Sequence, residues 1–235
     1  MELYILIGIG VVILVLLFVY LLKRAAEKKT KILQELAVQM EGIYSKDVSE
    51  TFKSRLNSFI LFTKPCKCSF PSHLVQATTD GIERAVFEFH STVEGKAGLA
   101  EWLSSDVDRP PDERYEYTVL YLRSDKLNLP QFILTKHGFW DGISSAFGLQ
   151  KDINIESHKN FSDGYSLHGA DETAIRNLFN GQIISYFENN WTFSAEGHGQ
   201  EMIIYCDKLM TDDIQPFMEK GIEAFNLFQR NHTFA

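Results

Sequence analysis

The hydrophobic pattern begins with an apolar run from Leu3 to Leu22, twenty residues without a charged side chain. Twenty residues in an α-helix span about 30 Å, which matches the thickness of the hydrocarbon core of a bilayer. Tyr4 and Tyr20 lie near the two ends of the run, where aromatic rings favour the headgroup region. The pattern predicts a transmembrane anchor over residues 1–22.

Basic residues follow this run directly, and only Glu27 opposes them: Lys23, Arg24, Lys28, Lys29 and Lys31. Because basic residues favour the cytoplasmic side, we expect an inner-membrane protein with its N-terminus outside and its C-terminal part in the cytoplasm. We also expect these five side chains to contact anionic lipid headgroups. A cleaved signal peptide is the competing interpretation, but the acidic start and the length of the run argue against it.

Helical periodicity continues past the basic residues, with apolar side chains at Ile32, Leu33, Leu36, Ala37 and Met40. Gly42 follows as an expected C-terminal cap. The spacing predicts a basic juxtamembrane helix over residues 23–41 that leads into a cytoplasmic domain over residues 42–235.

From there to about residue 137 the pattern favours strands. Residues 83–90 include an alternation of side chains, and residues 114–122 are rich in β-branched and aromatic residues. Residues 131–135 form a third short candidate after Pro130. The polar stretch 91–113 is expected to connect the first two strands, either as a hairpin loop or as a loop with one short turn of helix at its centre. We leave open whether the domain divides into two subdomains near residue 137.

The C-terminal part alternates between helical and extended patterns. An amphipathic segment over 139–147 precedes a predicted strand over 152–156, and Phe161, Tyr165 and Leu167 are expected to pin a loop to the core. A helix is predicted to begin near Asp171 and to continue past Gly181, with a kink there.

Two further strands are predicted at 191–196 and 201–206, with glycines between them as hairpin punctuation. A last helix is predicted to begin with Thr211 as its N-cap. Its expected buried face consists of Ile214, Phe217, Met218, Ile222, Phe225 and Phe228. The fold class predicted from these elements is α+β, with a mostly antiparallel sheet and packing helices.

The net negative charge of the domain limits the classes of partner that it can bind. The chain has a net charge of −8, and the residues from Ile32 onward comprise 18 basic and 29 acidic side chains. Nucleic-acid binding depends on neutralising phosphates, so an acidic domain excludes that class of partner. We expect this domain to stand away from an anionic leaflet while the basic residues near the anchor are attracted to it.

Candidate chemistry is sparse. Cys66 and Cys68 would face the same side of a strand, and His73 is near enough to act as a third metal ligand. Ordinary reduced cysteines are the simpler interpretation, so we assign neither a metal nor a cofactor. His137 with Asp141, and His158 with Asp163, have the spacing of a catalytic dyad, but neither pair has a nucleophile-elbow context. No catalytic residue is assigned.

The order of several short motifs resembles a group of uncharacterised bacterial single-pass membrane-anchored proteins. The resemblance covers residues 83–180 and is carried by Tyr117-Thr118-Val119, Leu127–Leu134, Asp152–Ile155, Phe161-Ser162, Tyr165–Gly169 and Ala174–Phe179. It implies an N-terminal membrane segment and a domain without an assigned activity.

The favoured function is therefore a membrane-anchored cytoplasmic binding or scaffolding module. Its partner is left open, and a protein is one candidate. Two alternatives remain: a membrane-tethered, hydrolase-like enzyme with a site assembled from distant residues, and an accessory subunit of a membrane complex. A pocket with convergent polar groups would favour the enzyme, whereas an exposed apolar patch would favour partner binding.

Overall fold

The computed structural model describes residues 2–63, 68–93, 113–137, 152–190 and 192–232. The described strands are β1 (Ile43–Asp47), β2 (Cys68–Thr79), β3 (Ile82–Val93), β4 (Glu113–Ser124), β5 (Leu129–Lys136), β6 (Tyr165–Gly169), β7 (Ser194–Gly199) and β8 (Glu201–Asp207). The helices are α1 (Glu2–Gln39), α2 (Glu50–Leu56), α3 (Ile60–Thr63), α6 (Lys159–Gly164), α7 (Glu172–Leu178), α8 (Gly181–Asn189) and α9 (Ile214–His232), the last preceded by the 3₁₀ turn η1 (Thr211–Asp213).

The strands form one eight-stranded sheet in the order β1-β2-β3-β4-β8-β7-β5-β6, and each neighbouring pair is antiparallel. The predicted α+β class with a mostly antiparallel sheet is confirmed. The strand β8 lies between β4 and β7, so residues before and after position 137 contribute to the same sheet.

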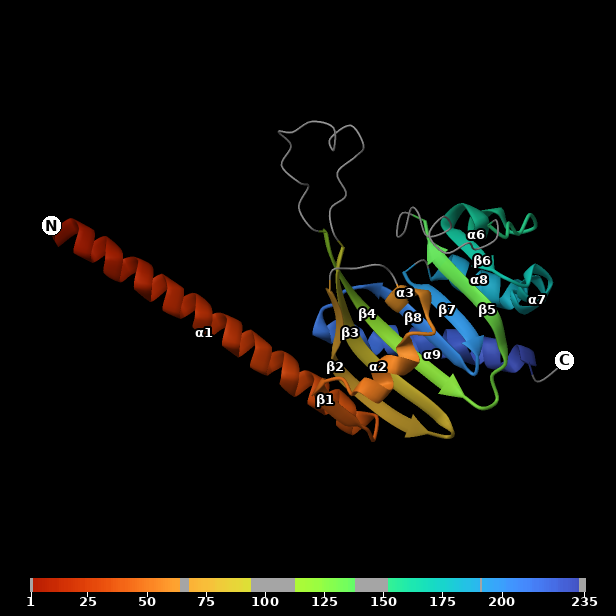
Figure 1. The fold of residues 1–235 in the computed structure, drawn as a ribbon, viewed down its shortest axis with the longest axis horizontal. Helices are drawn as coiled ribbons and strands as arrows, with labels where there is room; N and C mark the ends of the chain where they lie inside the picture. Colours follow the sequence, from red (N-terminus) through yellow and green to blue (C-terminus); the bar gives the residue numbers. More distant parts are fainter. Residues whose placement is uncertain (1, 64–67, 94–112, 138–151, 191, 233–235) are drawn as a thin grey trace, which may run out of the picture.

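The sheet has a hydrophobic core on each face because successive side chains of a strand point to opposite sides. In β4, Leu120 and Leu122 face the core that also holds the end of α1 and the whole buried face of α9. Val119 and Tyr121 face the second core, under α2 and α3. Figure 1 shows α2 and α3 in front of the sheet and α9 behind it.

The helix α1 runs without interruption from the apolar run into the domain. Its segment Ile7–Gln39 has a mean hydropathy of 2.3 in its most apolar window and is the described helix long and apolar enough to cross a membrane. That window is fully exposed, whereas Leu33, Leu36 and Ala37 are buried against the sheet. One helix therefore joins a membrane-length segment to the core.

The end of α1 differs from the predicted glycine cap. Glu41 adopts the left-handed conformation with φ of 55°, and the Gly42 N–H donates to the Ala37 carbonyl at 2.8 Å. Gly42 is needed for another reason: a Cβ there would collide with the carbonyl oxygen of Gln76 on β2. Glycine thus permits the close approach of the chain to the sheet.

The predictions for the long regular elements are confirmed. The stretches 83–90, 114–122 and 131–135 lie within β3, β4 and β5, and the antiparallel pairing of β3 with β4 agrees with the predicted hairpin. The last helix packs its predicted face on the sheet, with Phe225 and Phe228 completely buried. The predicted segment 139–147 lies outside the described residues.

Two predictions around β6 are wrong. Residues 152–156 form no strand; the Ile153 N–H donates to the Leu167 carbonyl, and Asp152 accepts from the Leu167 N–H, in place of a ladder. The segment predicted as a loop around Phe161 is instead α6 followed directly by β6. Phe161, Tyr165 and Leu167 are nevertheless all buried, as the pattern predicted.

Three boundaries are also corrected. The helix predicted to bend at Gly181 is two helices, because Asn180 accepts from the Gln182 and Ile183 N–H groups and begins α8 anew. The strand predicted from Trp191 begins at Ser194. Thr211 starts the turn η1 and is not the N-cap of α9. The pattern does not predict β1 and β2 individually, and the helices α2 and α3 lie in a region expected to favour strands.

Candidate functional site

The best-defined polar site lies where α1 meets the sheet. The Lys29 ammonium donates to the Glu88 carboxylate of β3, with Nζ 2.6 Å from Oε1. The Glu88 side chain is 6% exposed and the Lys29 side chain 23% exposed. Because a buried carboxylate is costly without a partner, this ion pair ties the helix to one position on the sheet.

Further charged groups continue from Glu88 across the same face. His90 Nε2 lies 3.6 Å from Glu88, and His90 Nδ1 lies 3.1 Å from Glu116 on β4. Glu116 also accepts a hydrogen bond from Lys208 at 2.7 Å, and this bond is the main reason why its pKa is lowered. We call Lys29, Glu88, His90, Glu116 and Lys208 the junction row.

A second histidine, His73, contacts Tyr44 on the neighbouring strand β1. His73 lies in an irregularity of β2, with φ of 55°, and its Nδ1 is 2.9 Å from the Tyr44 hydroxyl on β1. Burial lowers the pKa of His73, and the positive charge of Lys29 lowers it further. The site therefore favours the neutral imidazole.

The charged side chains of the junction row contact one another. Its chemistry suits a mechanical joint: α1 is fixed by an ion pair, a buried apolar stripe and the close approach at Gly42. These three contacts hold α1 at one position against β2 and β3.

The five basic residues predicted to contact the membrane surface divide into two groups. Lys23, Arg24 and Lys28 are exposed on α1. Lys29 is used in the junction row, and Lys31 lies 3.8 Å from Glu35 on the helix surface. Lys29 therefore binds the domain.

The residues considered as metal ligands do not converge among the described positions. Cys66 lies outside the described residues, Cys68 is exposed at the start of β2, and His73 is bonded to Tyr44. Cys206 is buried on β8, and β3 and β4 lie between its strand and β2. Within the part of the chain that the structure describes, no group of three or more His, Cys, Asp or Glu side chains could hold a metal.

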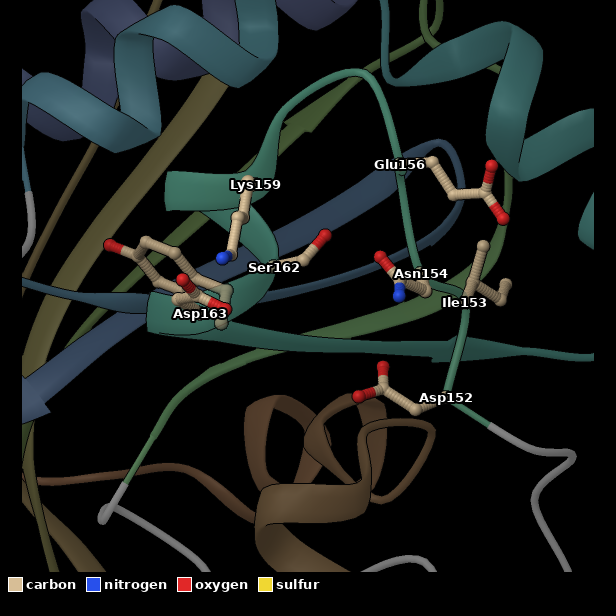
Figure 2. Close-up of a pocket in the computed structure, with 8 residues that line it drawn as sticks. Asp152, Ile153, Asn154, Glu156, Lys159, Ser162 and Asp163 are labelled. Atoms are coloured by element: carbon tan, nitrogen blue, oxygen red, sulfur yellow. The ribbon is translucent and has the colours of Figure 1, made fainter.

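A cavity of about 350 Å³ lies between α6 and the segment before it (Figure 2), lined by Asp152, Ile153, Asn154, Glu156, Lys159, Ser162, Asp163 and Tyr165. Its volume is in the range of small-molecule sites. Asp152 accepts from the Leu167 N–H at 2.8 Å, and Ser162 accepts from the Ile155 N–H at 3.1 Å. Figure 2 shows Glu156 pointing away from Lys159. Two of the polar groups thus hold the backbone that shapes the cavity.

The histidines of the two candidate dyads contact other groups among the described residues. His137 contacts the Asp163 carbonyl and the Ser166 hydroxyl, and Asp141 lies outside the described residues. His158 lies 3.8 Å from Glu188. Both histidines are held by structural partners close to β6 and α8.

The second face of the sheet has its own buried carboxylate. Glu196 of β7 is 2% exposed and accepts from the Ile60 and Leu61 N–H groups at 2.6 and 3.0 Å. The Tyr205 hydroxyl donates to it at 3.2 Å. Glu196 therefore fixes the start of α3 on the sheet.

Comparison with known proteins gives one structural similarity. No protein-family model and no curated protein matches the chain. The crystal structure of the mycobacterial trehalose monomycolate transport factor A, TtfA, matches with a TM-score of 0.54 and 10% sequence identity, over 86% of this chain and 93% of that one. At this identity the similarity concerns the fold.

The junction row was missed in the sequence, although a signal for it exists. Arg84, Val86, Glu88 and His90 alternate with the apolar residues of β3 and share the face that carries Val86 into the core. A carboxylate that continues an otherwise core-facing alternation needs a cationic partner. The partner, Lys29, is 59 residues away and could not be identified without the fold.

Proposed function

We propose that this protein is a single-pass inner-membrane protein whose sheet domain lies in the cytoplasm and serves as an accessory binding module of a membrane transport assembly. The observation that carries the proposal is the continuous helix α1, which joins an exposed membrane-length segment to the core through Leu33 and the Lys29–Glu88 pair. A rigid joint of this kind lets a membrane event reposition a cytoplasmic surface, which an accessory subunit requires.

The orientation is supported by charge. Lys23, Arg24 and Lys28 are exposed immediately after the apolar run, where positive charge favours the cytoplasmic side. The likeness in fold to TtfA, described as a transport factor, supports a role beside a transporter.

Orientation is tested by fusing a reporter after Ala235. We expect fluorescence from a cytoplasm-dependent reporter and no activity from alkaline phosphatase, which needs the periplasm to form its disulfides. The opposite pair of results would reverse the orientation.

The accessory role is tested by breaking the joint. Proline inside a helix removes a hydrogen bond and clashes with the preceding turn, so Lys28→Pro should uncouple the anchor from the domain, whereas Lys28→Ala should not. The full chain with a C-terminal tag is purified in mild detergent and its membrane partner is identified by mass spectrometry.

We expect the same integral-membrane transporter to co-purify with wild type and Lys28→Ala, and to be lost with Lys28→Pro while that variant stays in the membrane fraction. Equal recovery with all three chains would contradict the joint as the basis of the function. Absence of a transporter from the wild-type sample would contradict the accessory role.

The membrane-tethered enzyme is the second candidate, favoured by the cavity of about 350 Å³ beside α6. Lys159 and Asp163 line it from α6, together with Asn154. A hydrolytic activity of the purified full chain that is lost in Asp163→Asn, with the fold intact by circular dichroism, would favour this candidate.

A further inference from the structure

The end of the sheet that carries Phe70 and Tyr115 lies on the same side as the membrane segment of α1. We propose that this end of the domain sits in the headgroup layer of the bilayer that holds α1, with both aromatic rings inserted among the lipid headgroups. The inference rests on the membrane anchoring in the proposed function and adds a second, peripheral contact with lipid.

The first step is the short distance between anchor and domain. Lys29, the first residue of α1 tied to the sheet, comes seven residues after Leu22, the end of the apolar run. At about 1.5 Å per residue, those seven residues span about 10 Å of helix. Glu88 therefore lies only about 10 Å beyond the edge of the hydrocarbon core.

The second step is that β3 runs alongside α1, in the opposite chain direction. Two contacts fix this: Gly42, bonded to Ala37, lies against Gln76, which pairs with Ala85 of β3, and Lys29 pairs with Glu88. From Ala37 back to Lys29 the helix covers about 12 Å. From Ala85 to Glu88 the strand covers about 10 Å. Because these two lengths are nearly equal, the strand runs nearly parallel to the helix. Residues of β3 after Glu88 therefore lie progressively closer to the membrane.

The third step places the aromatic residues. Phe70 is paired with His90, two residues beyond Glu88, and Tyr115 is paired with Ser91, three residues beyond it. These steps cover about 7 and 10 Å along the strand. These lengths are nearly equal to the distance of about 10 Å between Glu88 and the edge of the hydrocarbon core, so both residues lie close to that edge. Each headgroup region is about 5–8 Å thick, so both residues fall within it.

The side chains at this level suit that layer. Phe70 is 51% exposed and Tyr115 is 37% exposed, although large aromatic rings are normally buried. Each ring is held by a neighbour, Phe70 by His90 at 5.0 Å and Tyr115 by Tyr117 at 6.3 Å between centroids. The exposed Arg114 adds a cation for lipid phosphates. Aromatic rings with a basic neighbour are typical of the membrane interface.

This arrangement differs from the expectation that an acidic domain stands away from the leaflet. The net negative charge belongs to the whole domain, whereas contact is made by one end of the sheet. Zwitterionic phosphatidylcholine, which exerts no net repulsion on acidic groups, is therefore the appropriate lipid for the test.

The experiment measures the depth of a fluorescent label in the full chain reconstituted in phosphatidylcholine vesicles. Ser69 is exposed and pairs with Ser91, so Ser69→Cys reports the level of Tyr115 without removing either aromatic ring. Lys126→Cys, exposed beyond the opposite end of β4, is the matched control. Cys66 and Cys68 are replaced by serine. Cys206 can remain, because burial raises its pKa to about 12 and keeps the thiol unreactive.

With a spin-labelled headgroup in the vesicles, we expect a nitrobenzoxadiazole label at position 69 to lose most of its fluorescence and the label at 126 to lose little. In a Phe70→Ser/Tyr115→Ser background the loss at position 69 should decrease markedly. Equal quenching at 69 and 126, or quenching at 69 that ignores the two serines, would overturn the inference.

Flotation of the same vesicles after an alkaline wash separates the two proposals. A chain that floats but is unquenched at position 69 refutes the peripheral contact and leaves the anchor intact. A chain that does not float refutes the anchor and the contact together.

Discussion

Two ion pairs of the junction row have nearly the same length and different burial, and they allow a direct comparison of stability. Lys29–Glu88 measures 2.6 Å with side chains 23% and 6% exposed, and Lys208–Glu116 measures 2.7 Å with side chains 37% and 46% exposed. Distance alone would predict the same effect for both. Burial predicts different effects, because an exposed pair is screened by solvent.

Lys29→Met keeps the aliphatic stem and leaves the Glu88 carboxylate without its main partner. Breaking a buried pair costs about 3–5 kcal/mol, and since Lys29 is partly exposed we expect about 3 kcal/mol. Lys208→Met should cost about 0.5 kcal/mol. Lys29→Met/Glu88→Leu should recover much of the loss, because the uncompensated charge has gone.

The assay is urea unfolding of the full chain in mild detergent, followed by near-ultraviolet circular dichroism, which reports the packed aromatic core. Equal, small losses for Lys29→Met and Lys208→Met would refute the reasoning, and so would a double variant less stable than Lys29→Met alone. In either case the junction would be held by its apolar contacts.

Three further outcomes follow from the packing. Phe225→Ala should lower the free energy of unfolding by about 3–5 kcal/mol, because its ring is completely buried under the sheet. Lys220 is exposed, so Lys220→Ala should change the free energy of unfolding by less than about 0.5 kcal/mol. Equal effects would mean that α9 is not docked on the sheet. Glu196→Gln should cost about 2–4 kcal/mol in the same assay, because hydrogen bonds from two backbone N–H groups to a carboxylate are weakened. Burial lowers the pKa of His73 below 6.5, so near that pH the unfolded chain binds more protons than the folded chain and stability falls on acidification. His73→Gln should therefore reduce the difference in unfolding free energy between pH of about 7.5 and about 5.5. An unchanged difference would contradict this role of His73.

The sequence predicted long elements with a clear pattern, but not β2, which is as long as β3 and has an irregularity between Ser72 and Val75. The buried residues of α9 repeat over about four turns, from Ile214 to Phe228. The strand β3 alternates from Arg84 to Phe89, and β4 is rich in β-branched and aromatic residues. Short elements lack that redundancy. The helix α2 has seven residues, and its main signal is Ser49, which accepts from the Phe52 N–H. Segment 152–156 has a strand-like pattern, but a side chain of its own occupies the place of the ladder.

The candidate site could be predicted only in part, for a different physical reason. The basic residues after the anchor are visible as a cluster, yet whether Lys29 faces lipid or protein depends on β3, which is distant in the sequence. Glu88 is visible as a polar residue on a core-facing alternation, but its neighbours His90 and Glu116 become one row only through the register of β3 with β4. The register between strands, and not the order of residues along the chain, decides which of these side chains come into contact.

The position of β8 between β4 and β7 also dictates the order in which the chain can be completed during synthesis. The strand β4 ends at Ser124, but its second neighbour is not finished until Asp207 has left the ribosome. At about 5–20 residues per second, this leaves an unpaired central strand edge for several seconds, and such edges promote association between chains. With the membrane anchoring proposed above, α1 leaves the ribosome first, so this edge is exposed at the membrane surface. The topology thus makes a folding intermediate with an open central edge unavoidable.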